Sequence, residues 1–347
     1  MIDRKYAEFA WERAAELLSI DSPSGFTAQA AQWVKGAFEI LGCQAEITTK
    51  GGVLIDLGGE DSEDALLLEA HTDTLGAMVA EVKGNGRLRL TPLGGMNANN
   101  AEAENLRVYT RDGKILEGTL QLCNASIHVN GDYSTISRSF DKTVEAVLDE
   151  DVHSAADTRA LGVEVGDIVC FDPRTRRTAG GYLKSRFLDD KLSVGILLGF
   201  AKYLSDHKIT LKRRVYVHVT VYEEVGHGGS ASVPAGVTEA ISVDMGCVGE
   251  GLQCTERQVS ICAKDSGGPY SYEVVGKLID AARKMGADYA VDVYPHYGSD
   301  VEATLRSGVD IRHGLIGAGV YASHGYERSH MDGVYNSILV LCGYLNV

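Results

Sequence analysis

The sequence predicts an α/β protein with a mixed, mostly parallel sheet, helices on both faces, and a small β-rich domain inserted into it. Helical and strand-like patterns alternate in both outer parts of the 347-residue chain, which is typical of such a sheet. Between them the pattern changes to short alternating segments separated by glycine, which favours a β-rich domain. We therefore expect a discontinuous α/β domain over residues 1–75 and 179–347 and an inserted domain over residues 76–178.

Two helical patterns and three strand patterns make up the N-terminal part. Apolar residues recur at helical spacing over residues 3–20 and 27–41, and Ser22-Pro23-Ser24-Gly25 separates the two segments. Three strand patterns follow, over residues 45–49, 53–57 and 65–70. We expect both helices to cover the sheet that these strands begin.

The inserted domain is expected to contain half-buried strands, because apolar and polar residues alternate there with a period of two. These segments are residues 77–82, 86–90, 106–110, 114–122 and 167–171. One short helix is expected around residues 153–157, and long helical patterns are scarce.

Helices and strands alternate again after Gly181. A strongly apolar helix is expected over residues 191–204, and a β-branched and aromatic strand over residues 215–222. The other expected elements are strands at 240–243, 259–263, 289–293 and 311–316 and helices at 272–285 and 332–344. This alternation supports a mostly parallel or mixed sheet.

The strand over residues 215–222 runs directly into two adjacent carboxylates, Glu223 and Glu224. A carboxylate at the mouth of an apolar sheet is costly to desolvate unless a cation or hydrogen-bond donors compensate. The pattern therefore indicates a metal centre. The alternative is that the strand simply stops and both side chains reach solvent in a loop.

Other potential metal ligands favour the metal centre. His71 and Asp73 follow one further apolar strand, and Asp244 follows another. Open α/β sheets place their binding crevice at the carboxyl ends of the strands, so we expect these side chains to meet. Asp189, just before the apolar helix, and His324, near the C-terminus, complete the set.

Composition argues against several classes of function. The chain carries 33 Lys and Arg against 48 Asp and Glu, a net charge of −15, which argues against nucleic acid or an anionic membrane as a partner. Its seven cysteines form no CxxC pair, so we expect a reduced, cytoplasmic setting. The N-terminus lacks an apolar signal region, and no run of about 18 apolar residues occurs. We therefore expect neither secretion nor a membrane span.

Together, these motifs resemble the M42 family of metallo-aminopeptidases, which includes glutamyl, deblocking and tetrahedral aminopeptidases. The motifs are His71-Thr72-Asp73, Leu188-Asp189-Asp190, Glu223-Glu224-Val225-Gly226, Val243-Asp244 and His324. Each is weak alone, but their combination in this order is specific, and the resemblance spans nearly the whole chain. The related M20 and M28 enzymes share the ligand order. The 118 positions from His71 to Asp189 (189 − 71), which contain the insertion, favour M42.

The resemblance implies two divalent metal ions per chain, with zinc as the expected ion and cobalt or manganese as alternatives. The implied ligands are His71 and Asp244 on one ion, Glu224 and His324 on the other, and Asp189 between them. It also implies that Glu223 is the general base and that Asp73 holds His71 in its ligating tautomer. Since neighbouring strand residues point to opposite sides, we expect Glu223 and Glu224 to diverge.

The chain departs from the family pattern at several positions, which indicates a divergent branch. Tyr222 stands where the family usually has glutamine, and Thr72 where methionine is frequent. The segment from Tyr321 to His330 differs from the family's Arg-Tyr-x-His-Ser-Pro, which bears on substrate preference more than on metal binding. His330 is a rival ligand, and Gly298-Ser299-Asp300 resembles a Gly-Thr-Asp segment expected to form a wall of the site.

Other polar residues have a structural interpretation. His218 lies within a strand and is expected to be a hydrogen-bonded core residue. Asp190 is expected to support Asp189 rather than to bind metal. Buried thiols are expected at Cys247, Cys254 and Cys262, and exposed arginines at Arg174, Arg176 and Arg177.

We expect hydrolysis of the N-terminal peptide bond of short peptides, with Glu223 taking a proton from a metal-activated water. The inserted domain resembles the family's dimerisation module, which implies dimers and assemblies up to a dodecamer. The alternatives are an M20- or M28-like hydrolase of an N-blocked or amidated metabolite, a glycosidase, and a non-catalytic assembly protein. Retaining glycosidases need facing carboxyls about 5–5.5 Å apart, which neighbours on one strand do not provide.

Overall fold

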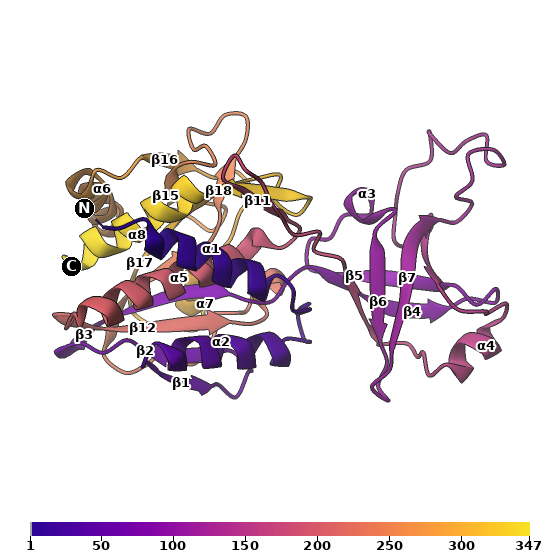
Figure 1. Ribbon diagram of the computed structural model, residues 1–347, viewed down its shortest axis with the longest axis horizontal. Coiled ribbons are helices and arrows are strands. Elements are labelled where there is room, and N and C mark those ends of the chain that lie inside the picture. The colour runs from indigo at the N-terminus through magenta and orange to yellow at the C-terminus, as the bar shows by residue number, and fades with distance from the viewer. Residues whose placement is uncertain (1) are drawn as a thin grey trace. The chain divides into compact units, whose positions relative to one another are not determined.

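The computed structural model describes residues 2–347 and separates into two compact units (Figure 1). The first, which we call the α/β unit, comprises Met1–Asp73 and Arg174–Val347. The second, the barrel unit, comprises Thr74–Pro173. The candidate site described below lies in the α/β unit.

A 12-stranded mixed sheet forms the centre of the α/β unit and confirms the predicted fold class. Its central strands pair in parallel, in the order β12 (Arg213–Thr220), β3 (Asp61–His71), β13 (Val237–Val243) and β17 (Arg312–Tyr321). The other strands are β1 (Gln44–Ile47), β2 (Val53–Asp56), β10 (Arg176–Arg177), β11 (Tyr182–Ser185), β14 (Gly246–Val248), β15 (Val259–Lys264), β16 (Tyr289–Val293) and β18 (Glu327–His330). Because the central strands are parallel, their carboxyl ends meet at one edge of the sheet.

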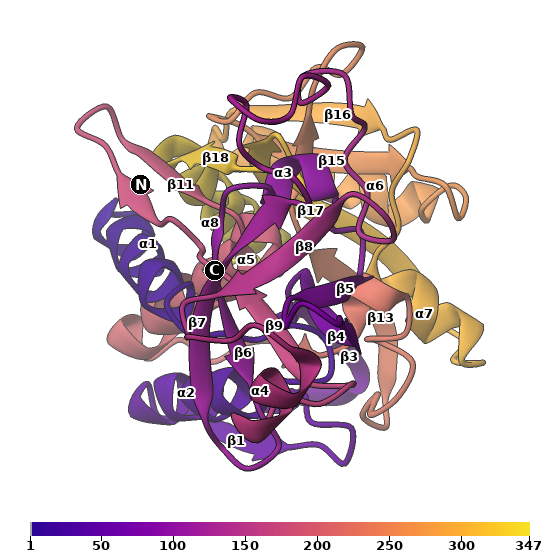
Figure 2. The ribbon, with the colours of Figure 1, turned by 90° about the vertical axis from the view of Figure 1, so that its right-hand side faces the viewer.

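Helices pack on both sides of this sheet. Figure 2 separates α1 (Lys5–Leu17) and α2 (Ala28–Ile40) on one side from α7 (Asp300–Arg306) on the other. The remaining helices of the unit are α5 (Leu188–His207), α6 (Tyr272–Met285) and α8 (Met331–Leu345). The α1–α5 contact is unusually close, since a Cβ added at Gly195 or Gly199 would lie 2.5 or 2.7 Å from a carbonyl oxygen of α1.

One local prediction was wrong near the candidate site. The strand predicted over residues 215–222 ends at Thr220, and Glu223–Val225 form a 3₁₀ turn. Tyr222 is left-handed (φ 72°) and ends the extended chain before the carboxylates. Glu223 and Glu224 are therefore not strand residues, and the alternation of side chains along a strand, from which we predicted that they point to opposite sides, does not apply to them. Gly298 and Ser299 precede α7, which begins at Asp300 and whose seven residues are too few to give a clear helical pattern in the sequence.

The barrel unit is a closed antiparallel β-barrel, so the inserted segment is β-rich as predicted. Its strands, in barrel order, are β4 (Gly76–Val82), β5 (Leu88–Leu93), β8 (Val144–Leu148), β7 (Ile115–Leu122), β6 (Asn105–Tyr109) and β9 (Ile168–Phe171). Two short helices, α3 (Ala98–Ala101) and α4 (Ala155–Ala160), accompany them. Glu145 of β8 is buried and forms ion pairs with Lys83 and Arg87. Burial opposes ionisation of Glu145, but the two cations lower its pKa overall.

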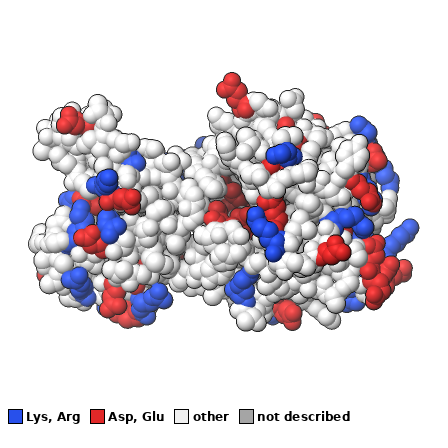
Figure 3. Space-filling view, turned by 180° about the vertical axis from the view of Figure 1, so that it is seen from behind, with Lys and Arg blue, Asp and Glu red and all other residues white. Residues whose placement is uncertain are grey.

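The face of the molecule drawn in Figure 3 carries acidic and basic side chains interspersed. Within residues 2–347, the helices all fall short of the length or apolarity that crossing a bilayer requires. All seven cysteines are free thiols, and Cys254 and Cys262 are buried whereas Cys247 is partly exposed. Arg174, Arg176 and Arg177 are exposed, as expected.

Candidate metal centre

The predicted site residues come from distant parts of the sequence but lie at one edge of the sheet. Their places in the fold are as follows: His71 ends β3, Asp189 lies at the start of α5, Glu223 and Glu224 form the turn after β12, Asp244 follows β13, and His324 lies between β17 and β18. The positions of His71, of the Glu223–Glu224 pair and of Asp244 follow directly from the strand order, because β12, β3 and β13 are adjacent and parallel and their carboxyl ends lie side by side.

Asp189 lies at the centre of the cluster. Its Oδ1 is 3.1 Å from His71 Nε2, and its Oδ2 is 3.6 Å from His324 Nε2. His324 Nε2 is also 3.7 Å from Glu224 Oε2. Ligand atoms of His71, Asp189 and Glu224 lie within 4.8 Å of one another, a spacing that one metal ion can bridge.

A second group of ligand atoms within 4.8 Å comprises His71, Asp190 and Asp244. Asp190 accepts a hydrogen bond from the main-chain N–H of His71 at 3.2 Å. Its other oxygen is buried and has no hydrogen-bond partner among residues 2–347. Asp190 therefore lies beside His71 and Asp244, within reach of an ion that these two residues could bind, although we expected it only to support Asp189.

Asp73 fixes the turn that carries the two glutamates. Its carboxylate accepts the main-chain N–H of Glu223 at 3.1 Å and that of Glu224 at 3.3 Å. Ser24 Oγ donates to the same carboxylate at 2.5 Å. Because Asp73 is fully buried, these three donors compensate the cost of its desolvation.

The orientation of His71 leaves its Nε2 directed into the cluster. Its Nδ1 lies 2.9 Å from the carbonyl oxygen of Asp73 and 3.5 Å from the Asp73 carboxylate. The shorter contact, to the carbonyl, fits a proton on Nδ1 and a free lone pair on Nε2. Glu223 Oε2 lies 3.7 Å from this Nε2.

The electrostatics of the cluster fit a divalent cation. Burial raises the pKa of Glu224 to about 8 and that of Asp244 to about 7, and it raises the pKa of Glu223 well above its usual range. For Asp189, contacts with His324 and His71 outweigh burial and lower the pKa. One oxygen of Glu224 is buried with no hydrogen-bond partner in the described part of the chain. Oxygen and imidazole ligands of this kind suit zinc, cobalt or manganese.

A cavity of about 460 Å³ opens beside these side chains. Besides the acidic groups and His324, it is lined by Gly226, Met245, Cys247, His296, Tyr297, Gly298 and Ser323. Tyr297 donates to the carbonyl oxygen of Met245 at 3.0 Å, which ties the two loops of the cavity wall together. The Gly298 segment thus does line the cavity.

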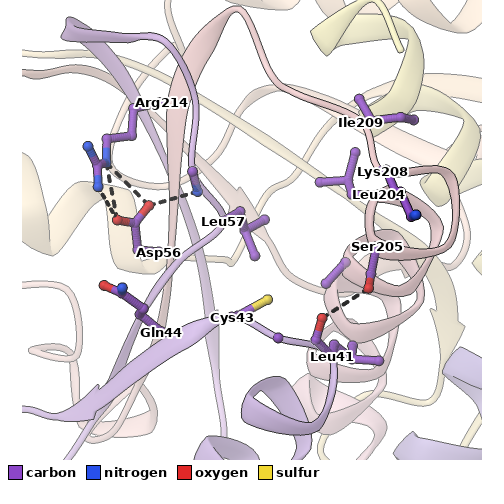
Figure 4. A pocket seen from close by; sticks show the side chains of 13 residues that line it. Leu41, Cys43, Gln44, Asp56, Leu57, Leu204, Ser205, Lys208, Ile209 and Arg214 are labelled. Carbon is purple, nitrogen blue, oxygen red and sulfur yellow. Dashed lines mark hydrogen bonds and ion pairs between the residues drawn. The ribbon is translucent and has the colours of Figure 1, made fainter.

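A separate pocket of about 380 Å³ lies near the end of α5 (Figure 4). Its main polar groups already have partners, since Arg214 pairs with Asp56 and Ser205 Oγ donates to the Leu41 carbonyl. The groups of ligand atoms described above lie elsewhere. This pocket is therefore not the candidate metal centre.

Of His218 and His330, which both lie outside the cluster, His218 differs from expectation. His330, the rival to His324, has both ring nitrogens engaged elsewhere, since its Nε2 lies 2.9 Å from the Gly180 carbonyl oxygen and its Nδ1 accepts the N–H of Asp332 at 3.0 Å. His218 is buried, but neither ring nitrogen has a hydrogen-bond partner within residues 2–347. Burial lowers the pKa of His218 to about 4, which keeps the ring neutral.

Sequence reasoning missed Glu327, which contacts two of the predicted ligands through their main chains. It accepts the N–H of Asp189 and the N–H of His324, each at 3.0 Å. The available signal was its position three residues after His324, in the segment that departs from the family pattern.

The chain is similar in sequence and in structure to known aminopeptidases. A sequence model described as M42 glutamyl aminopeptidase matches residues 51–339. YhfE of Bacillus subtilis (strain 168), a protein with an aminopeptidase name, is 40% identical over 334 residues, covering 96% of each chain. Aminopeptidase APDkam598 from the archaeon Desulfurococcus kamchatkensis has a similar structure, with a TM-score of 0.86, 20% identity, and coverage of 98% of this chain and 95% of that one. The TET1 peptidase of Pyrococcus horikoshii gives a TM-score of 0.84 at 21% identity, covering 97% of this chain and 99% of that one.

Proposed function

The chain belongs to the M42 glutamyl aminopeptidase family, and we propose that it is a two-metal aminopeptidase that releases N-terminal residues from short peptides. One observation carries this proposal: imidazole and carboxylate ligands converge at the carboxyl ends of adjacent parallel strands, with a buried oxygen of Glu224 left without a partner. Such a cluster is costly without cations. It fits the metal dependence of the family.

We assign the ligands as follows: His71 and Asp244 to one ion, Glu224 and His324 to the other, and Asp189 to both. When bound, two such ions supply a polarised water and an electrophilic hold on the scissile carbonyl. Asp190 supports this arrangement through its hydrogen bond to the His71 main chain. Zinc is the proposed ion, with cobalt and manganese as alternatives.

Glu223 is the proposed general base. Its carboxylate lies beside the cluster, 3.7 Å from His71 Nε2, and faces the same cavity. In the proposed reaction Glu223 takes a proton from the attacking water and then delivers it to the leaving amine. Asp73 fixes the position of Glu223 through the main chain rather than through the carboxylate, so the base remains free to carry the proton.

The cavity beside the cluster is the proposed binding site for the peptide's N-terminal residue. Its volume of about 460 Å³ falls in the range of small-ligand sites. Met245, Cys247 and Tyr297 line the cavity together with side chains of the cluster. A peptide N-terminus in this cavity would bring its first carbonyl to the ligands.

The test is hydrolysis of acidic, basic and aliphatic aminoacyl p-nitroanilides by metal-free protein, with zinc, cobalt or manganese added back. We expect activity to return as metal content approaches two ions per chain. Two bound ions with no activity on any compound would contradict the aminopeptidase proposal and favour an N-blocked or amidated substrate. Release of reducing sugar without metal would favour the glycosidase alternative.

We further propose that the barrel unit mediates self-association and that the protein acts in the cytoplasm. The proposal of self-association is supported by the TET1 peptidase of Pyrococcus horikoshii, which can assemble into a tetrahedron or a large octahedral shell. Native mass spectrometry tests it directly. A monomer at micromolar concentration would contradict it.

A further inference from the structure

Glu327 connects two segments that carry proposed metal ligands. The residue is fully buried at the start of β18. Its Oε2 accepts the N–H of Asp189 and its Oε1 accepts the N–H of His324, each at 3.0 Å. Asp189 and His324 are far apart in sequence, and their side chains lie 3.6 Å apart. A single carboxylate therefore joins the backbones from which two facing ligands project.

Both oxygens of Glu327 are needed for this connection. A neutral amide of the same size has one acceptor oxygen and an NH₂ group that would face the second N–H. A buried N–H left without an acceptor destabilises the conformation that buries it. Glutamine at this position could therefore hold one of the two segments but not both.

The turn that bears His324 requires such a connection. Ala322 and His324 both have positive φ, at 62° and 59°, a conformation that residues other than glycine adopt only when their surroundings enforce it. His324 is also relatively exposed, with 40% of its side chain accessible. Packing alone therefore constrains this ligand less than it constrains His71, which is 1% exposed.

Glu327 is itself rigidly held. Its backbone pairs with Ser185 in the β11–β18 ladder, just before the chain enters the Asp189 segment. The neighbouring Tyr326 donates its hydroxyl to the Arg174 carbonyl at 2.9 Å. The carboxylate thus projects from a fixed strand toward both turns.

We infer that Glu327 is a positioning residue for the ion assigned to Glu224 and His324. It holds Asp189 and His324 at bridging distance without touching the ion. The inference rests on the proposed two-metal function and adds a residue that belongs to none of the ligand motifs. Residues that orient metal ligands typically contribute about 10–100-fold to metal affinity.

The test is the metal affinity of Glu327→Gln, measured by competition with a chromophoric chelator. We expect one of the two ions to bind about 10–100-fold more weakly than in the wild type. The other ion should change less, because, of its three assigned ligands, only the shared Asp189 is held by Glu327, whereas the first ion has both Asp189 and His324 held by it. Glu145→Gln is the matched control, since Glu145 is also buried but lies in the barrel unit, where its carboxylate pairs with the side chains of Lys83 and Arg87 rather than with main-chain N–H groups of the proposed ligands. It should bind both ions normally.

Melting temperatures with and without metal separate positioning from general destabilisation. For Glu327→Gln we expect the increase in melting temperature on adding metal to shrink, beyond any change in the metal-free protein. If this variant does not fold, Glu327→Asp provides the same measurement, because the shorter carboxylate can reach only one amide well. Wild-type affinity for both ions in the folded variant would overturn the inference. Failure of the wild type itself to bind two ions would instead contradict the proposed function.

Discussion

Replacing Glu223 by glutamine tests the proposed chemistry most directly, because it removes the carboxylate but keeps its size. The turn should persist, since Asp73 holds the main-chain N–H of Glu223 at 3.1 Å and that of Glu224 at 3.3 Å. These contacts do not depend on the charge of the Glu223 side chain. We therefore expect the variant to fold and to bind both ions.

The expected loss of activity is large. A positioned general acid or base contributes about 10²–10⁴-fold to the rate, and each tenfold corresponds to about 1.36 kcal/mol. The loss is then about 2.7–5.4 kcal/mol of transition-state stabilisation. The other carboxylates that line the cavity, Asp189, Glu224 and Asp244, are assigned as ligands. Since ligands cannot easily replace the base, we expect a decrease in kcat of about 10²–10⁴-fold.

The assay is kcat on the best p-nitroanilide substrate, with bound metal measured in the same sample. Asp189→Asn serves as the contrasting variant, because it should lose metal as well as activity. A Glu223→Gln protein with two ions and more than about a tenth of wild-type kcat would refute Glu223 as the base. Loss of an ion from Glu223→Gln would instead show that Glu223 is a ligand.

Three further perturbations test the ligands and the fold. His324→Ala should lose one of the two proposed ions, whereas His330→Asn, which keeps an acceptor to cap α8, should retain both; metal analysis decides. Gly199→Val should lower the free energy of unfolding by about 1–3 kcal/mol by overpacking the α1–α5 contact. Gly36→Ala should raise the free energy of unfolding slightly, because beyond its own helix backbone and chain neighbours no described atom lies within 4 Å of the added carbon. If denaturant titrations gave the same change in this free energy for both glycine variants, the overpacking argument would be contradicted. Because the folded-state pKa of Glu145 is lowered, its charge stabilises at neutral pH and this contribution is lost in acid. Glu145→Gln should therefore lose less stability than the wild type between about pH 6 and pH 3, and an unchanged pH profile would contradict the ion pairing.

The sequence pattern could predict the positions of some site residues but not of others. His71 and Asp244 each follow a short, mostly apolar strand pattern, and the structure ends β3 at His71 and β13 just before Asp244. Parallel strands then bring the two residues to one edge. Asp189 and His324 lie at a helix start and in a turn, where no local pattern indicates their neighbours. Their residue types made them candidate ligands, and the family resemblance then implied their roles.

The turn at Glu223 shows why local patterns fail close to such a site. Strand-forming residues continue to Tyr222, but Tyr222 adopts a left-handed conformation. The carboxylate of Asp73, 150 positions away from Glu223, accepts the two amides that follow this bend. A tertiary contact thus overrides the β propensity of the last residues. His218 is a similar case, because its burial was predictable, whereas the absence of a hydrogen-bond partner for either ring nitrogen among residues 2–347 was not.

Asp73 and Glu327 together hold the main chains of Glu223, Glu224, Asp189 and His324. Main-chain N–H groups are the same for every residue type except proline, so this framework does not depend on which side chains project from it. It depends instead on two buried acids, of which Glu327 is absent from the ligand motifs. A ligand substitution should therefore empty a metal position while leaving the backbone of the cavity intact. Loss of Glu327 should move ligands that are all still present, which is why metal affinity rather than ligand identity distinguishes the two cases.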